Sequence, residues 1–83
     1  MTFHTYILRS TTTSRFYVGH TGNLQKRLFE HNNNRTRSTQ NRGPWKLFHS
    51  EEYATKVQAS RREREIKRMK SRKWIEDLAR ASR

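Results

Sequence analysis

Cysteine is absent from the 83 residues of this sequence, so the chain can form neither a disulfide nor a thiolate metal site. The same absence excludes catalysis by a cysteine nucleophile and is typical of a reducing compartment. No run of apolar residues approaches the length of a membrane span, and the N-terminus has no hydrophobic signal segment. Together these absences predict a cytoplasmic protein without a membrane partner.

Apolar residues are also scarce, at 30% of the chain. The length predicts one domain covering residues 1–83, at the small end of what folds alone. A domain of this size usually has little stability to spare without disulfides or a metal. The core is therefore expected to be thin and to consist mainly of aromatic and aliphatic side chains.

Acidic residues are few as well. The 19 Lys and Arg residues outnumber the 7 Asp and Glu residues, and the formal net charge is +12. Such a surplus repels itself in a compact fold unless a polyanion neutralises it. Nucleic acid is the commonest polyanionic partner, because Lys and Arg side chains on its phosphates release counterions. The charge predicts nucleic-acid binding, although a basic accessory protein of an RNA–protein assembly would have the same composition.

The N-terminal part of the chain predicts a β-hairpin. Residues 3–8 and 15–19 have the aromatic and β-branched composition of strands, and the polar residues between them are too few for a crossover connection. Because side chains alternate along a strand, Tyr17 and Gly19 share one face, and Tyr6 lies on the same surface if the register permits. A turn is expected at Gly19, followed by a helix.

The helix after Gly19 can be capped by Thr21 or Asn23, since both are good N-cap residue types. At 100° per residue, two leucines and His31 form its inward stripe. Arg27 lies at the edge of that stripe, and Lys26 points almost the opposite way. We therefore expect Arg27 to be partly buried at a site and Lys26 to be in solvent, where it can contact nucleic acid.

Residues 32–43 contain no apolar side chain, and their length indicates a functional loop. Arg35, Arg37 and Arg42 make it a candidate phosphate-contacting flap, and a disordered insertion is the alternative interpretation. Residues 45–49 then read as a third strand, on which Lys46 is a further candidate for nucleic-acid binding.

A capping box at residues 55–58 predicts a second helix that begins at about Lys56. Ala59, Ile66 and Met69 form its inner stripe, and Glu63 lies on that stripe between them. An inward carboxylate on a cationic helix is costly unless it is paired or binds a metal. Glu63 is thus either the partner of a neighbouring arginine or a functional group.

A break at residues 69–71 precedes a final helix, which Ser71 can cap. Trp74, Ile75 and Leu78 supply its apolar face. Residues 79–83 are expected to fray.

One set of residues recurs in the same order as in a known family. The set consists of Tyr6, Tyr17-Val18-Gly19, Arg27, His31 and Glu63. This order and spacing resembles the GIY-YIG nuclease domain, and the resemblance extends from Phe3 to about Leu78. It implies an α+β fold in which a three-stranded antiparallel sheet is flanked by helices in the order ββαβαα. The first motif departs from the family, because it reads His4-Thr5-Tyr6, and an asparagine found late in some members has no counterpart after Asn41.

The resemblance also implies roles for these residues in metal-dependent cleavage of phosphodiester bonds. Tyr17 is the best candidate for the general base, although a free phenol has a pKa of about 10 and needs nearby cations to act near neutral pH. Arg27 matches the geometry of phosphate oxygens, and Glu63 would hold one Mg²⁺ or Mn²⁺. Tyr6 and either His20 or His31 would orient the water or relay the proton.

Two alternatives stay open within this interpretation. His20 directly follows the turn glycine, and its ordinary pKa makes it a rival general base. Tyr6 and Tyr17 can also be cross-strand aromatic residues that merely stabilise a thin sheet. The sequence predicts an endonuclease acting on DNA with low sequence specificity, or else a non-catalytic basic nucleic-acid-binding module on the same scaffold.

Overall fold

The computed structural model describes residues 2–33 and 42–81. Its elements are β1 (Phe3–Ser10), β2 (Phe16–Thr21), α1 (Leu24–Asn32), β3 (Trp45–Tyr53), α2 (Lys56–Met69) and α3 (Arg72–Ala81). Both strand pairs are antiparallel, and the strand order in the sheet is β2-β1-β3. The predicted α+β fold with ββαβαα order is confirmed.

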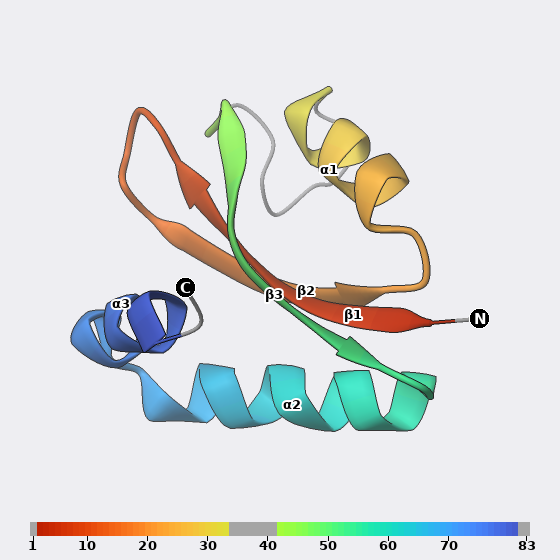
Figure 1. The fold of residues 1–83 in the computed structure, drawn as a ribbon. Coiled ribbons are helices and arrows are strands. Elements are labelled where there is room, and N and C mark those ends of the chain that lie inside the picture. The colour runs from red at the N-terminus through yellow and green to blue at the C-terminus, as the bar shows by residue number, and fades with distance from the viewer. Residues whose placement is uncertain (1, 34–41, 82–83) are drawn as a thin grey trace.

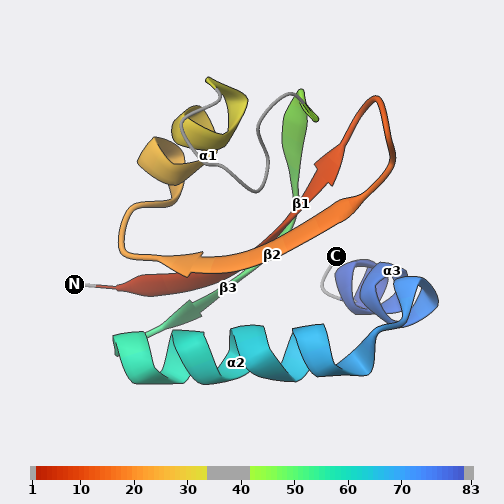
Figure 2. The ribbon, with the colours of Figure 1, turned by 180° about the vertical axis from the view of Figure 1, so that it is seen from behind.

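The sheet is the middle layer of the molecule. Figures 1 and 2, which view it from opposite sides, show α1 on one face of the sheet and α2 with α3 on the other. Because β1 is the central strand, its alternating side chains contribute to both layers. The fold therefore has two small hydrophobic clusters, one on each face of the sheet.

On the face covered by α2 and α3, the buried cluster consists of Ile7, Val18, Ile66 and Ile75. On the face covered by α1, it consists of Tyr6, Leu8 and Trp45, and Tyr17, Leu24 and Leu28 pack against these. Each face is thus closed by only a few large side chains, as the low apolar content requires. Tyr6 and Tyr17 lie on the same surface, as predicted.

All three strands extend beyond their predicted ends, because pairing with a neighbouring strand continues past the apolar residues. The turn predicted at Gly19 is wrong. Gly19 lies inside β2, directly opposite Tyr6 of β1, and the chain leaves the strand only after Thr21. No glycine among the described residues has a positive φ angle, so backbone conformation does not explain this glycine.

Side-chain caps begin the helices where the sequence indicated. Asn23 caps α1 by accepting a hydrogen bond from the Lys26 backbone N–H, and the capping box of Thr55 and Gln58 begins α2. Ser71 Oγ accepts from the Trp74 backbone N–H at the start of α3. The helix boundaries near residues 23, 55 and 71 are therefore local properties of the sequence.

Two predictions about the C-terminal helices are wrong. Met69 is 46% exposed, because α2 ends there, beyond the sheet-covering stripe. Ala79 is buried, and α3 continues to Ala81 instead of fraying from Ala79. Within the described part of the chain, no helix has both the length and the apolar character needed to cross a membrane.

The Asn32 side chain joins the end of α1 to the start of β3 through two hydrogen bonds with the backbone of Trp45. Asn32 donates to the Trp45 carbonyl oxygen over 2.9 Å and accepts from the Trp45 backbone N–H over 2.6 Å. This pair holds α1 against the sheet, so the residues that α1 presents to the sheet keep a defined position.

Candidate functional site

Tyr6 lies at the centre of the site, against the backbone of β2. Its side chain is 1% exposed, and its hydroxyl lies directly over Gly19. A Cβ atom at Gly19 would come within 2.6 Å of the Tyr6 hydroxyl oxygen and 2.8 Å of its Cζ. Glycine at this position therefore makes room for the phenol of the neighbouring strand, which is a reason for glycine within a strand.

The Tyr6 hydroxyl connects two side chains of α1. Its oxygen lies 3.0 Å from Nε2 of His31, and it is hydrogen-bonded to Arg27 as well. Arg27 can only donate, so the phenol oxygen accepts from it. The direction of the Tyr6–His31 bond is set by the tautomer of His31, and the phenol donates when Nε2 carries no hydrogen.

Burial sets the protonation states in this group. It raises the pKa of Tyr6 to about 12, although the hydrogen bond from Arg27 opposes the rise. Burial also lowers the pKa of His31 to about 4, and the Arg27 charge adds to that effect. At neutral pH Tyr6 is therefore a protonated phenol and His31 a neutral imidazole.

Tyr17 is the more accessible of the two tyrosines. It is only partly buried, and its ring centroid lies 4.7 Å from that of His31 and 6.4 Å from that of Tyr6. The Arg27 guanidinium lies within electrostatic range of the Tyr17 hydroxyl. Tyr17 therefore combines access to water with a cationic neighbour, whereas Tyr6 is sealed from water.

Glu63 reaches β2 from the other face of the sheet, where it is bonded to two basic side chains. Its Oε1 lies 2.6 Å from Nδ1 of His20, and its Oε2 lies 2.7 Å from Nζ of Lys67. Burial alone would raise the pKa of Glu63, but these bonds outweigh it and lower the pKa. The Glu63 side chain is 17% exposed and ionised at neutral pH.

The alternative interpretation, in which Glu63 pairs with a neighbouring arginine, does not hold, because its partners are His20 and Lys67. Arg27 pairs with Glu30 over 3.3 Å, one turn along its own helix. Arg62 pairs with Glu51 of β3 over 2.8 Å. Helical periodicity predicted that Glu63 points towards the sheet. It did not predict which strand residue Glu63 contacts.

β2 is an edge strand, so groups from the two faces of the sheet can come close together around it. Arg27 and Glu63 both contribute to the electrostatic field at the Tyr6 phenol. Tyr6, Tyr17 and His31 group on the α1 face of the sheet, together with Arg27 of α1. Glu63 reaches His20 of β2 from the α2 face, so its carboxylate and the two phenols approach β2 from opposite sides.

Next to these groups is an open groove of about 600 Å³ at the end of β2 and the beginnings of α1 and α2. The residues that line it include Phe3, His20, Asn23, Lys26, Arg27 and Lys56. Glu30 is the carboxylate in this lining, and it is paired with Arg27. The groove is thus cationic and can accept a phosphate chain beside His20 and Arg27.

The cations predicted to bind nucleic acid are divided between two places. Lys26 is exposed in the groove, as expected. Arg42 and Lys46 lie elsewhere, at the end of the sheet where β1 joins β2 and β3 begins. Arg35 and Arg37 fall outside the described residues. Lys56 of the groove was missed, because a lysine that begins a helix carries no signal of its own.

A metal would have to rely on Glu63. Within residues 2–33 and 42–81, no three His, Cys, Asp or Glu side chains gather to ligate one ion. Mg²⁺ and Mn²⁺ sites in nucleic-acid enzymes commonly use one or two carboxylates together with waters and substrate phosphate. An ionised, partly exposed Glu63 fits that kind of site, provided that Lys67, which is 53% exposed, moves off Oε2.

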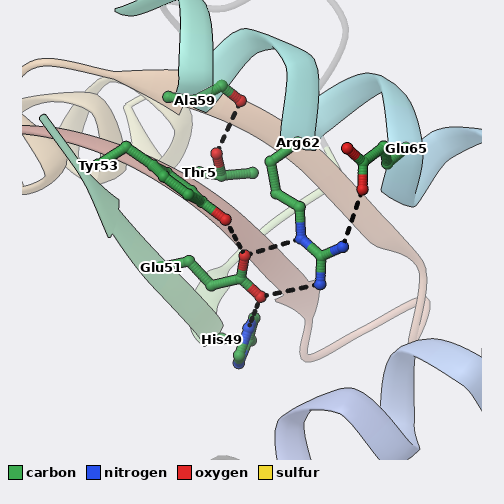
Figure 3. A network of polar contacts seen from close by, with 7 residues as sticks. All are labelled: Thr5, His49, Glu51, Tyr53, Ala59, Arg62 and Glu65. Carbon is green, nitrogen blue, oxygen red and sulfur yellow. Dashed lines mark hydrogen bonds and ion pairs between the residues drawn. The ribbon is translucent and has the colours of Figure 1, made fainter. Parts of the chain in front are cut away.

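A second polar network was not foreseen from the sequence. Figure 3 shows Glu51 of β3 in contact with His49, Tyr53 and Arg62. Its hydrogen bonds lower the pKa of Glu51 to about 2, against the effect of burial. The network contains none of the groove residues, so we assign it to the packing of β3 against α2. His49 belongs to this network and is buried.

Comparison with known proteins shows what this arrangement is similar to. The family model described as the GIY-YIG catalytic domain matches residues 2–76. A UPF0213 protein of Bacillus velezensis is 36% identical over 80 residues, which cover 92% of this chain and 80% of that relative. A UPF0213 protein of Clostridium perfringens is 40% identical over 67 residues, which cover 80% of this chain and 71% of the relative.

A solved structure agrees with these sequence matches. The solution NMR structure of a UPF0213 protein from Bacillus halodurans superposes with a TM-score of 0.59 at 29% identity. The match covers 98% of this chain and 85% of the other.

Proposed function

Since the chain belongs to the GIY-YIG family of nuclease domains, we propose that it is a metal-dependent endonuclease that hydrolyses phosphodiester bonds of DNA with low sequence specificity. The observation that carries the proposal is the group of Tyr6, Tyr17 and Arg27 beside β2, with Glu63 reaching the same strand from the other face of the sheet. The net charge of +12 supports a polyanionic substrate. The cationic lining of the open groove suits a backbone that is held by its phosphates, and this explains the low sequence specificity.

Tyr17 acts as the general base in this proposal. Its partial exposure gives it access to water, and the Arg27 guanidinium lies within electrostatic range of it. A phenolate formed during proton transfer would have that cation beside it. The Arg27 guanidinium, one-third exposed, can also donate to the non-bridging oxygens of the scissile phosphate, whose geometry its planar donors match.

Tyr6 and His31 take a different role from the one that the sequence indicated. Both side chains are 1% exposed, so neither can orient an attacking water. Tyr6 instead holds Arg27 through its hydroxyl. Neutral His31 is hydrogen-bonded to that hydroxyl and contacts the ring of Tyr17. We assign both as positioning residues for Arg27 and Tyr17.

Glu63 holds the metal in this proposal. Its carboxylate is already ionised, and its contact with Lys67 involves a side chain that is more than half exposed and free to move. When bound there, a divalent ion supplies Lewis-acid stabilisation of the departing 3′-oxygen. Mg²⁺ or Mn²⁺ suits a single carboxylate that is supplemented by water and phosphate oxygens.

His20 is the competing candidate for the base. Glu63 accepts from its Nδ1 over 2.6 Å, and this hydrogen bond leaves Nε2 with a lone pair that can take a proton. His20 also lines the groove. In that version Glu63 orients His20 in the way a carboxylate orients the histidine of a hydrolase.

The occupied carboxylate of Glu63 favours one further candidate function. Both of its oxygens are bonded to basic side chains, and a carboxylate that stays neutralised in this way binds no metal. The chain would then be a nucleic-acid-binding module without turnover. The same variants distinguish the two functions, because only the nuclease depends on Glu63 for a product.

The first test is nicking of supercoiled plasmid in Mg²⁺ or Mn²⁺, with EDTA as the blank. Arg27→Ala and Glu63→Ala should each lower the nicking rate by about a hundredfold or more, since each removes charge stabilisation in the transition state. Arg64→Ala, which removes an exposed cation of α2, should leave the rate nearly unchanged. The nuclease assignment would be wrong if the wild-type chain does not nick the plasmid. It would also be wrong if Arg27→Ala and Glu63→Ala nick it at the wild-type rate.

The choice of base is decided by two more variants in the same assay. Tyr17→Phe keeps the ring on His31 and removes only the hydroxyl, so it should abolish nicking while DNA binding persists. His20→Gln should then retain most of the rate. The reverse ranking would transfer the role of base to His20.

A further inference from the structure

The β1–β2 connection and the start of β3 form a second cationic surface. A groove of about 490 Å³ there is lined by Arg9, Thr11, Ser14, Lys46 and Phe48, among others, and its lining contains no carboxylate. Figure 1 shows this connection at the opposite end of β2 from the turn that leads into α1. The second groove is therefore separate from the one beside His20 and Arg27.

Arg9 is held in place by aromatic rings and not by an acid. Its guanidinium carbon lies 5.9 Å from the centroid of Phe16 and 6.0 Å from that of Phe48, within the range of cation–π attraction. Among the described residues, Arg9 makes no ion pair. Its charge is thus fixed in position and free to bind an anion.

Arg42 is attached to the same surface through its backbone. Its carbonyl oxygen accepts a hydrogen bond from Ser10 Oγ over 2.6 Å, and Thr12 Oγ1 donates to the carbonyl oxygen of Gly43 over 3.1 Å. The side chains of Arg42 and Lys46 are exposed, and neither forms an ion pair within the described part of the chain. Arg9 and Lys46 therefore line the groove without an ion pair among the described residues, and Arg42 is attached beside it. Glu76, which lines a neighbouring hollow with Arg9, is itself paired with Arg72.

The distance between the two grooves can be found from β1. Phe3 lines the first groove and Arg9 the second, and six residues of antiparallel strand span about 20 Å. Duplex DNA rises about 3.4 Å per base pair. A duplex that occupied both grooves would therefore contact them about six base pairs apart.

We propose that the hairpin patch, consisting of Arg9, Thr11, Ser14, Arg42 and Lys46, is a second DNA-contact site that binds backbone phosphates of the substrate away from the scissile bond. This inference rests on the proposed function, because it concerns the substrate of that site. The cations bind phosphate oxygens, and the two hydroxyls can donate to them. The patch affects affinity and leaves the chemical step unchanged, because it lies at the far end of the sheet.

The test uses the full chain and a fluorescein-labelled DNA duplex of two helical turns, in EDTA so that nothing is cut. Binding is measured by anisotropy between about 0.05 and 0.2 M NaCl. Arg42→Gln combined with Lys46→Gln should weaken binding about tenfold. The slope of log K against log [NaCl] should become less steep by about two, since each lost phosphate contact lowers the slope by about one. Arg9 stays unchanged because its ring contacts contribute to packing.

The matched control is Arg64→Gln combined with Arg68→Gln, which removes the same charge from the exposed side of α2. Both pairs are checked by thermal unfolding for an intact fold. Equal losses of affinity in the two pairs would overturn the proposal, because they would show an effect of net charge alone. A hairpin-patch effect that is larger than the control supports the proposal.

Plasmid nicking separates this inference from the proposed function. If the wild-type chain fails to nick but the hairpin pair still loses more affinity than the control pair, the nuclease assignment falls and the contact site stands. If the wild-type chain nicks and the two pairs bind alike, only the contact site falls.

Discussion

At the scale of single residues, the site depends on a fit between two neighbours on adjacent strands. Tyr6 can lie flat against β2 only because Gly19 has no side chain. From that position its hydroxyl reaches both Arg27 and His31. The short motif Tyr17-Val18-Gly19 is therefore a steric requirement of Tyr6 as much as a source of catalytic groups.

We predict that Gly19→Ala destabilises the fold and disturbs the site together. The new Cβ would lie 2.6 Å from the Tyr6 hydroxyl oxygen, and the buried phenol has no free space into which to move. Overpacking of this kind costs about 1–3 kcal/mol, which thermal or urea unfolding would show. Nicking should fall as well, because a displaced Tyr6 no longer holds Arg27.

Gly22→Ala is the control for this change. Its Cβ would meet Phe3 at 3.4 Å, an ordinary contact, so stability and nicking should stay close to the wild type. If Gly19→Ala unfolds at the same temperature as Gly22→Ala, the close approach of Tyr6 does not constrain this position.

At the scale of elements, β3 is joined to α2 by a carboxylate that four hydrogen bonds share. Glu51 accepts from Arg62 through both oxygens, at 2.8 and 3.2 Å, from Tyr53 at 2.6 Å, and contacts His49 at 2.8 Å. Figure 3 shows these bonds converging from a strand and a helix. Because each apolar cluster is small, a polar connection of this kind contributes a larger share of the packing.

We predict that Glu51→Gln lowers the free energy of unfolding by about 2 kcal/mol at neutral pH, since buried charge-assisted bonds are lost. The pKa of Glu51 is about 2 in the fold, below its ordinary 4.5. Its contribution is therefore complete above pH 4.5 and disappears as the pH falls towards 2. Urea unfolding at a series of pH values should show the two proteins converging in acid.

Glu65→Gln is the control for this prediction. Glu65 pairs with the same Arg62 over 3.2 Å but is 51% exposed, and exposed pairs contribute about 0–1 kcal/mol. The pKa of His31 is about 4 in the fold, below its ordinary 6.5. The free energy of unfolding of every variant therefore also decreases as the pH falls from about 6.5 to 4. Parallel pH curves for the wild type and Glu51→Gln would contradict the role assigned to Glu51.

At the scale of the whole molecule, charge dominates. The net charge of +12 is carried by a molecule whose Cα extents are 31 × 29 × 23 Å. Several cations are paired, but the two grooves keep unpaired ones at opposite ends of the sheet. The described residues therefore form two separate cationic grooves instead of a single anion pocket.

We predict that salt stabilises this protein by screening its self-repulsion. Raising NaCl from about 0.05 to 0.5 M should raise the melting temperature by about 5 °C, which corresponds to roughly 1 kcal/mol in a domain of this size. Scanning calorimetry measures the change. Arg61→Glu with Arg64→Glu, which replaces two exposed cations of α2 by anions, should show a smaller rise. A melting temperature that falls with added salt would contradict the prediction.

The sequence was informative wherever a structural signal is local. The caps at Asn23, Thr55 and Ser71 each bond to the residue three positions further along the chain, so the pattern alone predicts them. The alternation that puts Tyr6 and Tyr17 on one surface is local as well. Predictions failed where neighbours from other elements decide: the strand ends, the exposure of Met69 and the burial of Ala79.

By itself, then, the sequence determined the order of the elements, the excess of positive charge and the candidate residues, because periodicity, capping and composition are properties of a linear chain. Only the tertiary structure decided which groups meet. It brought Glu63 to His20 rather than to an arginine, made Gly19 the space for Tyr6 rather than a turn, and separated Arg42 and Lys46 from Lys26. The reason is physical: register and the packing of helices across a sheet depend on contacts between residues that are distant in sequence, and no local pattern records them.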